Sequence, residues 1–229
     1  QAITRVQAFA AKAADLSPEK VIVHNHLLGG GFGRRLEADG AARAVQIARH
    51  VDGPVKVVWT REEDVQHDMY RPYWVDRISA GLDGKGKLIA WNKRFAGSSV
   101  LARYLPPAFK DGLDPDSIEG AVDLVYELPN FHVEFVRVEP PGIPTAFWRS
   151  VGPSHNVFVT ESFIDEVAAA AKQDAVAYRR ALLDKSPRAK AVLNLAAEKA
   201  DWGKPLPKRS GRGVSLQNAF GSYMAHVAE

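Results

Sequence analysis

A glycine-rich run near the start of the chain constrains the fold more than any other feature. It follows an apolar, strand-like segment at residues 20–28, precedes an alanine-rich helical pattern, and reads Gly29-Gly30-Gly31-Phe32-Gly33-Arg34-Arg35. Glycine enters positive-φ conformations freely and lets a ligand approach the main chain. Successive N–H groups in such a loop form an anion-binding concavity, to which a helix N-terminus and two arginines add positive charge. The run therefore predicts a loop that binds a phosphorylated or anionic cofactor.

Two common glycine motifs do not match this run. The dinucleotide fingerprint needs Gly-x-Gly-x-x-Gly, but Leu36 stands three positions after Gly33. The mononucleotide phosphate loop needs a hydroxyl residue after Gly-Lys, and the run supplies arginines and then a leucine. A β-bulge or tight turn without a ligand remains the alternative, although a bulge seldom needs more than one or two glycines.

Composition excludes several classes of protein. The chain has 229 residues, 46% hydrophobic and 25% charged, which is typical of a globular protein with a substantial core. A net charge of +3 with dispersed basic residues does not indicate a nucleic-acid surface. No cysteine is present, so any redox chemistry has to come from a bound cofactor. No apolar run reaches the ~20 residues that span a bilayer, and no transmembrane segment is expected.

Hydrophobic periodicity predicts an α+β fold with helices packed on mixed sheets. Helices are expected near residues 4–15, 38–50, 155–171, 174–184 and 187–200, and strands near 20–28, 55–60, 73–83, 87–97 and 131–138. The turn sequence at residues 83–86 joins two of these strands into a hairpin. The order strand, glycine loop, helix and strand in the first 60 residues places the loop at the carboxyl end of a sheet strand.

This pattern divides the chain into two expected parts. Residues 1–100 form a cofactor-binding α/β unit with the glycine loop and the hairpin, and residues 101–229 form a second α+β part with three helices. The chain begins within a helical pattern and ends just after a strand-like one, so we expect a middle fragment truncated at its C-terminus.

Other residues with chemical potential fall into two clusters. At residues 145–156, Arg149 lies between bulky aromatic residues and a turn, which suits a fixed contact with an anionic cofactor group, or else a structural ion pair. At residues 61–72, His67 and Asp68 are acid–base or metal candidates, but the acidic residues there favour an ordinary helix start. No glycine-flanked serine elbow accompanies the Ser154-His155 pair, so a serine hydrolase is not indicated.

Two segments, Gly29–Arg35 and Thr145–Val167, strongly resemble the molybdenum-cofactor subunit of the xanthine dehydrogenase family. They are most similar to its isoquinoline 1-oxidoreductase and aldehyde-oxidising branch, which carries Leu-Leu-Gly-Gly-Gly-Phe-Gly-Arg-Arg and Phe-Trp-Arg-Ser-Val-Gly. The resemblance covers essentially the whole chain. It implies a molybdopterin-binding domain of a molybdenum-dependent oxidoreductase, with the cytosine dinucleotide form of the cofactor usual in that branch.

The resemblance also implies cofactor-binding positions. In the family, the main chain around the loop aromatic approaches the pterin and the metal, and a glutamine ahead of the loop reaches the metal's oxo ligand. Counting back from Phe32 places that glutamine at Gln1 without a gap. In the second segment, Trp148 stands where purine-oxidising members have an arginine. The implied cofactor-binding residues are Gln1, Gly30, Gly31, Phe32, Gly33, Arg34 and Arg149.

Departures from the family bear on the substrate and on activity. Purine hydroxylases carry a glutamate where this chain has Leu36. A purine is therefore a less suitable substrate than another N-heteroaromatic compound or an aldehyde. The family's catalytic glutamate belongs to a segment that is not among these residues, so this chain supplies no catalytic residue. We expect the isolated chain to be inactive and without cofactor. The resemblance implies an iron–sulfur partner subunit and leaves the compartment open. A non-catalytic binding or assembly module, or a nucleotide-phosphate-binding protein, remains as an alternative.

Overall fold

A computed structural model describes residues 2–229. The chain forms two compact units: the loop unit, Gln1–Pro72 with Pro140–Arg149, and the sheet unit, Tyr73–Glu139 with Ser150–Glu229. This division differs from the expected parts 1–100 and 101–229. The strands of the predicted hairpin pair with a later strand, and they therefore belong with the later helices.

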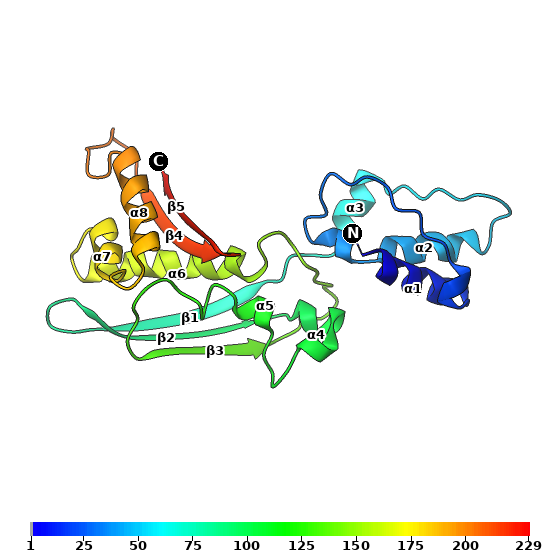
Figure 1. The fold of residues 1–229 in the computed structure, drawn as a ribbon, viewed down its shortest axis with the longest axis horizontal. Helices are drawn as coiled ribbons and strands as arrows, with labels where there is room; N and C mark the ends of the chain where they lie inside the picture. Colours follow the sequence, from blue (N-terminus) through cyan, green and yellow to red (C-terminus); the bar gives the residue numbers. More distant parts are fainter. Residues whose placement is uncertain (1) are drawn as a thin grey trace. The chain divides into compact units, whose positions relative to one another are not determined.

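The sheet unit contains a three-stranded mixed sheet and a two-stranded ribbon (Figure 1). The strands are β1 Trp74–Leu82, β2 Leu88–Gly97, β3 Phe131–Arg137, β4 Gly213–Ala219 and β5 Ser222–Ala228. In the three-stranded sheet, β1 pairs antiparallel with β2, and β2 pairs parallel with β3; in the ribbon, β4 pairs antiparallel with β5. The helices are α4 Val100–Tyr104, η3 Pro106–Ala108, α5 Pro115–Ile118, α6 Val151–Ala170, α7 Ala175–Ala181 and α8 Pro187–Lys199. The predicted α+β class with mixed sheets is confirmed, as are the three later strands and the three later helices.

The turn between β1 and β2 shows why the hairpin was predictable. The Asp83 carboxylate accepts hydrogen bonds from the N–H groups of Lys85 at 2.8 Å and Lys87 at 2.9 Å. Gly86 adopts a φ of +78°, which a residue with a Cβ rarely enters. Aspartate and glycine therefore fulfil local demands of the turn that can be recognised without tertiary information.

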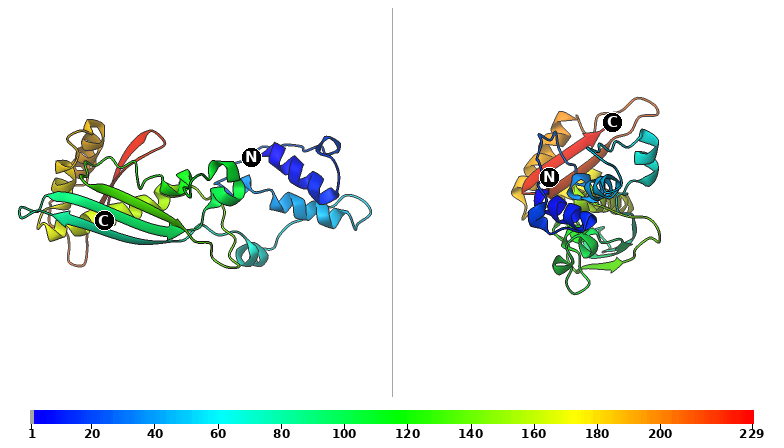
Figure 2. Two further views of the ribbon diagram at one scale, coloured as in Figure 1. Left: turned by 90° about the horizontal axis from the view of Figure 1, so that it is seen from below. Right: turned by 90° about the vertical axis from the view of Figure 1, so that its right-hand side faces the viewer.

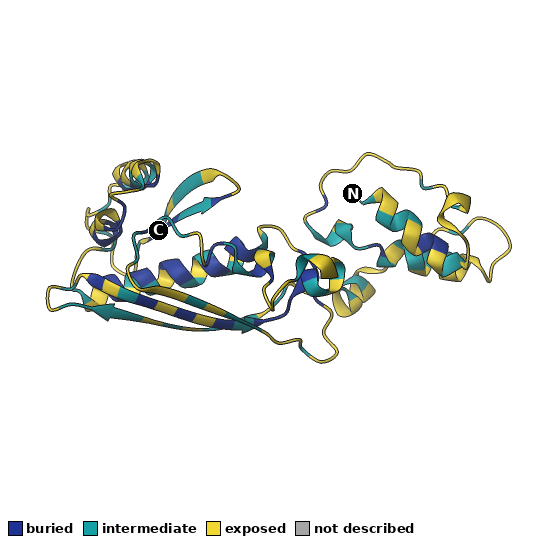
Figure 3. Cartoon of the chain, turned by 60° about the horizontal axis from the view of Figure 1, so that its bottom comes forward, coloured by how far each residue is buried: buried dark blue, intermediate teal, exposed yellow. Residues whose placement is uncertain are grey.

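The hydrophobic core lies between α6, the mixed sheet, and the C-terminal helices and ribbon (Figures 1 and 2). Buried and exposed residues alternate along β2, as Figure 3 shows, and Leu88 and Trp91 point to the core face. Ile164 from α6 and Leu193 from α8 belong to the same cluster. Each such side chain contributes roughly 1.5–3 kcal/mol when fully buried, so this cluster supplies most of the hydrophobic stabilisation.

A buried carboxylate ties the elements around this core together. Glu161 on α6 accepts hydrogen bonds from the Tyr126 hydroxyl at 2.8 Å, Arg179 Nε at 3.0 Å and the Leu216 N–H at 2.8 Å. These partners come from the irregular connection, α7 and β4, so a single side chain links three other parts of the sheet unit.

The loop unit is built from short helices and extended segments. Its helices are α1 Ile3–Ala14, η1 Pro18–Lys20, η2 Arg34–Leu36, α2 Asp39–Ala48 and α3 Arg61–His67, and α1 packs on α2. The predicted helices at residues 4–15 and 38–50 are confirmed. The predicted strands at 20–28 and 55–60 are wrong, because in the described part of the chain neither segment has a hydrogen-bonded strand partner.

Candidate functional site

The glycine loop connects the extended segment at residues 21–28 to η2. Gly30 and Gly33 have φ values of +117° and +89°, and Phe32 between them also lies in the left-handed region at +52°. The Phe32 side chain is 60% exposed, whereas Gly31 is buried. The loop therefore uses the conformational freedom of glycine. The Phe32 ring lies over Gly30, where an added Cβ would come within 2.9 Å of it, and the rest of the ring is exposed.

The main-chain donors of this loop are available to a ligand. Within residues 2–229, the N–H groups of Gly29–Gly33 donate no hydrogen bond. The carbonyls of Gly31 and Gly33 accept from the N–H groups of Arg35 at 3.2 Å and Leu36 at 3.0 Å, which fixes the end of the loop. A run of unpaired N–H groups on a fixed loop suits a ligand rich in acceptor atoms, because backbone donors are costly to leave unsatisfied when covered.

The loop packs directly on the second segment that the sequence singled out. A Cβ added at Gly33 would lie 2.7 Å from the carbonyl carbon and oxygen of Phe147 and 2.8 Å from the N of Trp148. Only glycine allows two backbones to approach this closely. The structure thus brings together two predicted site segments that are more than a hundred residues apart in the sequence.

Backbone pairing with residues 68–71 holds the Thr145–Arg149 segment in place. Tyr70 forms a parallel bridge with Thr145, in which the Tyr70 N–H donates to the Pro144 carbonyl at 2.9 Å and the Ala146 N–H donates to the Tyr70 carbonyl at 3.0 Å. Arg71 donates from Nη1 to the Arg149 carbonyl at 3.3 Å. Its guanidinium also lies 5.5 Å from the centroid of the neighbouring Trp148 ring. The Arg149 side chain is exposed and positively charged.

The sequence predicted that Arg34 supplies positive charge to the cofactor, but in the structure its guanidinium is paired with two aspartates. Its Nη1 and Nη2 donate to the two Asp39 carboxylate oxygens at 2.9 and 3.0 Å, and its Nε donates to Asp68 Oδ1 at 2.6 Å. Burial acts to lower the pKa of Arg34, but the hydrogen bonds and charges of the two aspartates outweigh it and raise the pKa. Each of the three guanidinium nitrogens thus donates one hydrogen bond to a carboxylate, and two carboxylates offset its positive charge.

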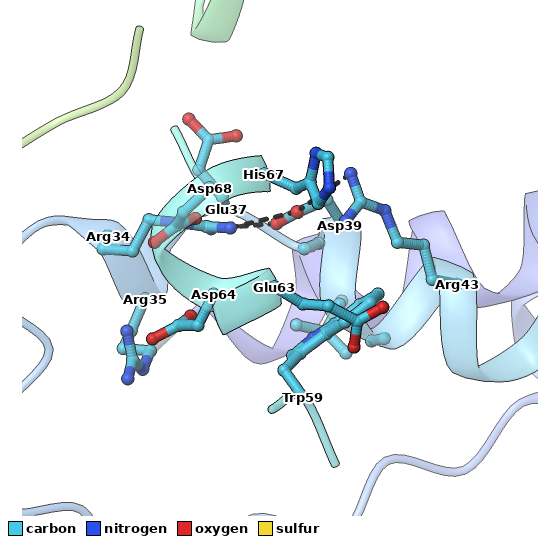
Figure 4. A pocket seen from close by; sticks show the side chains of 14 residues that line it. Arg34, Arg35, Glu37, Asp39, Arg43, Trp59, Glu63, Asp64, His67 and Asp68 are labelled. Atoms are coloured by element: carbon cyan, nitrogen blue, oxygen red, sulfur yellow. Dashed lines mark hydrogen bonds and ion pairs between the residues drawn. The ribbon is translucent and has the colours of Figure 1, made fainter. Parts of the chain in front are cut away.

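A cavity of about 340 Å³ lies beside this ion-pair cluster, entirely within the loop unit (Figure 4). Arg43 from α2 stacks over the Trp59 ring at 5.4 Å, and His67 and Asp68 contribute from α3 and the residue after it. Asp68 binds Arg34, so the acid–base role weighed for His67 and Asp68 gains no support from the geometry. No group of His, Asp or Glu side chains within residues 2–229 is arranged to hold a metal ion.

The structure brings several predicted site residues together and adds two that the sequence did not predict, Tyr70 and Arg71. Gly30, Gly31, Phe32 and Gly33 form the loop, while Gln1 lies outside the described residues. The roles of Tyr70 and Arg71 were missed, because only the fold brings them to residues 144–149. Their place in the polar cluster at residues 61–72, between an apolar segment and the hairpin, was the one available signal.

Comparison with known proteins places this site in a family. The sequence model of the molybdopterin cofactor-binding domain matches residues 1–183. The isoquinoline 1-oxidoreductase subunit beta of Brevundimonas diminuta is 33% identical over 226 residues, which cover 97% of this chain and 29% of that protein. A Gluconacetobacter polyoxogenes protein named membrane-bound aldehyde dehydrogenase [pyrroloquinoline-quinone] is 32% identical over 228 residues, covering 90% of this chain and 29% of its own length.

A solved structure shares the fold. The crystal structure of quinoline 2-oxidoreductase from Pseudomonas putida 86 superposes with a TM-score of 0.75 at 18% identity, covering 94% of this chain and 30% of that one. The chain thus spans under a third of the length of these proteins. Among the helices of residues 2–229, none has the length and apolar character needed to cross a membrane. The family match extends over both the glycine loop and the Thr145–Arg149 segment, and the chain belongs to the molybdopterin cofactor-binding domain family.

Proposed function

We propose that the Gly29–Gly33 loop and the Thr145–Arg149 segment hold molybdopterin, and that the protein carrying this chain is a molybdenum hydroxylase. One observation carries the proposal: a run of unpaired main-chain donors lies against the backbone of Phe147, inside the region matched by the family. Gln1, outside the described residues, is proposed as a further cofactor contact.

The described residues fit this cofactor. The unpaired N–H groups suit the phosphate and ring acceptors of a molybdopterin, and the exposed Arg149 supplies a nearby positive charge. The close packing at Gly33 leaves no room for a side chain and so fixes the loop against the Phe147 backbone. We further propose the cytosine dinucleotide form, which is usual in the branch that the chain resembles.

The chemistry divides between cofactor and protein. When bound, the molybdenum cofactor supplies a two-electron oxidation in which oxygen from water is added to a substrate carbon. The chain orients the cofactor through the loop, and Phe32 and Trp148 are partly exposed aromatic residues of the two segments that meet at Gly33. Such aromatic surface suits a planar N-heteroaromatic compound or an aldehyde. Leu36 offers no carboxylate for a purine.

The electrons have to leave the chain through a partner. We propose an iron–sulfur partner subunit as the electron acceptor, as the resemblance to the isoquinoline 1-oxidoreductase branch implies. We expect the isolated chain to be inactive, because the residues here include no counterpart of the family's catalytic glutamate.

Metal and cofactor analysis of the complete subunit, purified with its partner, tests the proposal. We expect one molybdenum and one pterin per subunit, release of a cytosine nucleotide on acid hydrolysis, and dye reduction with an N-heteroaromatic compound or an aldehyde. Pyrroloquinoline quinone without molybdenum would contradict the cofactor assignment. Absence of molybdenum after cofactor-replete expression would favour the binding-module or nucleotide-binding alternative.

A further inference from the structure

Arg34 forms a fork of hydrogen bonds whose geometry indicates a role other than supplying positive charge to a ligand. All three guanidinium nitrogens of Arg34 are engaged, two by Asp39 and one by Asp68. The three side chains are only 18%, 21% and 28% exposed. A planar guanidinium can bridge two carboxylates in this way, whereas a lysine ammonium cannot reproduce the fork.

The partners of Arg34 connect it to both halves of the proposed site. Arg34 follows Gly33, the residue that contacts the Phe147 and Trp148 backbone. Asp68 lies two residues before Tyr70, which pairs with Thr145. The Arg34–Asp68 hydrogen bond therefore joins the two chain segments that position the glycine loop and the Thr145–Arg149 segment.

Asp39 adds a third anchor at the start of α2. Burial acts to raise the pKa of Asp39, but Arg34 and Arg43 outweigh it and lower the pKa, so the carboxylate stays charged at neutral pH. Arg43 Nη2 lies 3.9 Å from the Asp39 Oδ2 atom, one helical turn further along α2. Asp39 is thus fixed from two sides and can hold the Arg34 guanidinium in one orientation.

We infer that Arg34 is a positioning residue: its fork to Asp39 and Asp68 sets the spacing between the loop N–H groups and the Thr145–Arg149 segment. The inference rests on the proposed function. Cofactor retention then depends on the geometry of the fork and on both carboxylates, not on the positive charge of Arg34. A charge role makes the opposite prediction for the aspartates, because removing a carboxylate would free the guanidinium for an anionic ligand.

The test compares Arg34→Lys and Asp68→Asn with the wild-type subunit, using molybdenum and pterin content after a fixed dilution and wash. We expect both variants to retain the cofactor about 10–100-fold more weakly, as is typical for residues that orient the groups contacting a metal centre. Matched controls are Arg61→Lys and Asp184→Asn, which change exposed ion pairs on α3 and in the sheet unit and should retain wild-type content.

Amide hydrogen exchange of the cofactor-free subunit provides a second, independent readout. If the fork positions the site, Arg34→Lys and Asp68→Asn speed exchange at the Leu36 and Tyr70 amides, whose hydrogen bonds flank the fork, while the controls do not. Wild-type cofactor content in Arg34→Lys, or higher content in Asp68→Asn, would overturn the inference. Absence of molybdenum from the wild-type subunit would instead contradict the proposed function.

Discussion

The two units of the chain obtain their order in different ways. Large apolar side chains fill the core of the sheet unit, including Leu88, Trp91, Ile164, Leu183 and Leu193. Within the described residues, the buried hydrophobic side chains of the loop unit are four alanines and Phe147. Large apolar side chains such as Leu27 are instead fully exposed there. Besides the packing of α1 on α2, the loop unit relies on ion pairs, the Tyr70–Thr145 backbone bridge and one close glycine contact.

This difference bears on function. A densely packed core fixes a unit without help, whereas a unit with few buried side chains can adjust to a ligand and gain stability from it. The candidate site lies in the second kind of region. Substitutions in the sheet unit should therefore act mainly on stability, and substitutions in the loop unit mainly on cofactor retention.

Removal of a buried charge in the sheet unit gives the largest expected effect. Asp76 lies 3.2 Å from Lys93 Nζ, which is fully buried and also donates to Asn156 at 2.6 Å. Asp76→Asn leaves that cation without its anion and should lower the free energy of unfolding by about 3–5 kcal/mol. Asp68→Asn, in the more exposed cluster of the loop unit, should cost about 1 kcal/mol or less. Urea unfolding of both variants measures the contrast; equal losses would contradict it.

The pH dependence of Asp76→Asn sharpens this result. Burial lowers the pKa of Lys93 below the 10.5 of an unfolded chain, an effect that Asp76 opposes. Without Asp76 the folded-state pKa falls further, so raising the pH toward 10.5 neutralises Lys93 and restores stability. The cost of Asp76→Asn should shrink as pH rises from 7 to 10, and a constant cost would exclude a charged Lys93 as its cause.

A matched pair of leucines tests the contrast in apolar burial. Leu193 on α8 is 0% exposed, and Leu27 is 106% exposed. Leu193→Ala should destabilise by about 2–5 kcal/mol, because it removes buried methyl groups and leaves a cavity. Leu27→Ala should change stability by less than about 0.5 kcal/mol. A large effect of Leu27→Ala in the isolated chain would show that residues 21–28 are packed in solution.

Two glycines in the same loop test the site at a smaller scale. Gly33→Ala forces a Cβ to within 2.7 Å of the Phe147 backbone at a φ of +89°, and should cost about 1–3 kcal/mol together with cofactor retention. Gly29 has open space around its Cβ position, so Gly29→Ala should leave the fold unchanged. Urea unfolding and molybdenum content together measure both effects. Equal behaviour of the two variants would contradict the close contact.

The smallest expected effects come from helix caps in each unit. Thr60 accepts from the Glu63 N–H at 3.2 Å at the start of α3, and Thr60→Ala should cost about 1 kcal/mol. Asp174 caps α7 and also accepts from Trp202 Nε1 at 2.8 Å. Asp174→Ala should therefore cost more than Thr60→Ala in thermal unfolding, and the reverse order would contradict the stronger anchoring of the sheet unit.

Sequence patterns predicted the sheet unit better than the loop unit. The hairpin turn at Asp83 and the alternation along β2 are local signals, and the structure follows them. The apolar segments at 20–28 and 55–60 have strand composition, but a strand also needs a hydrogen-bonded neighbour, which their own residues cannot reveal. The composition of a segment indicates its preference for strand conformation, but it does not show whether a neighbouring strand is present to pair with it.

The site was predicted in part for the same reason. The composition of the glycine run is enough to predict a ligand-binding loop. The role of Arg34, in contrast, depends on its hydrogen bond with Asp68, which is distant in the sequence. From the sequence, an arginine beside a glycine loop predicts a positive charge that contacts the ligand. Only the fold shows that Arg34 is ion-paired with two carboxylates.

Hydrogen exchange of the loop amides, with and without bound cofactor, tests whether the glycine loop binds molybdopterin. We expect molybdopterin to slow exchange at Gly29–Gly33, whose N–H groups are unpaired within residues 2–229, and to leave the β1–β2 turn at residues 83–87 unchanged. The turn is a suitable internal control because its amides are already bonded to Asp83. Unchanged exchange at Gly29–Gly33 in a subunit with full molybdenum content would contradict the assignment of this loop to the cofactor.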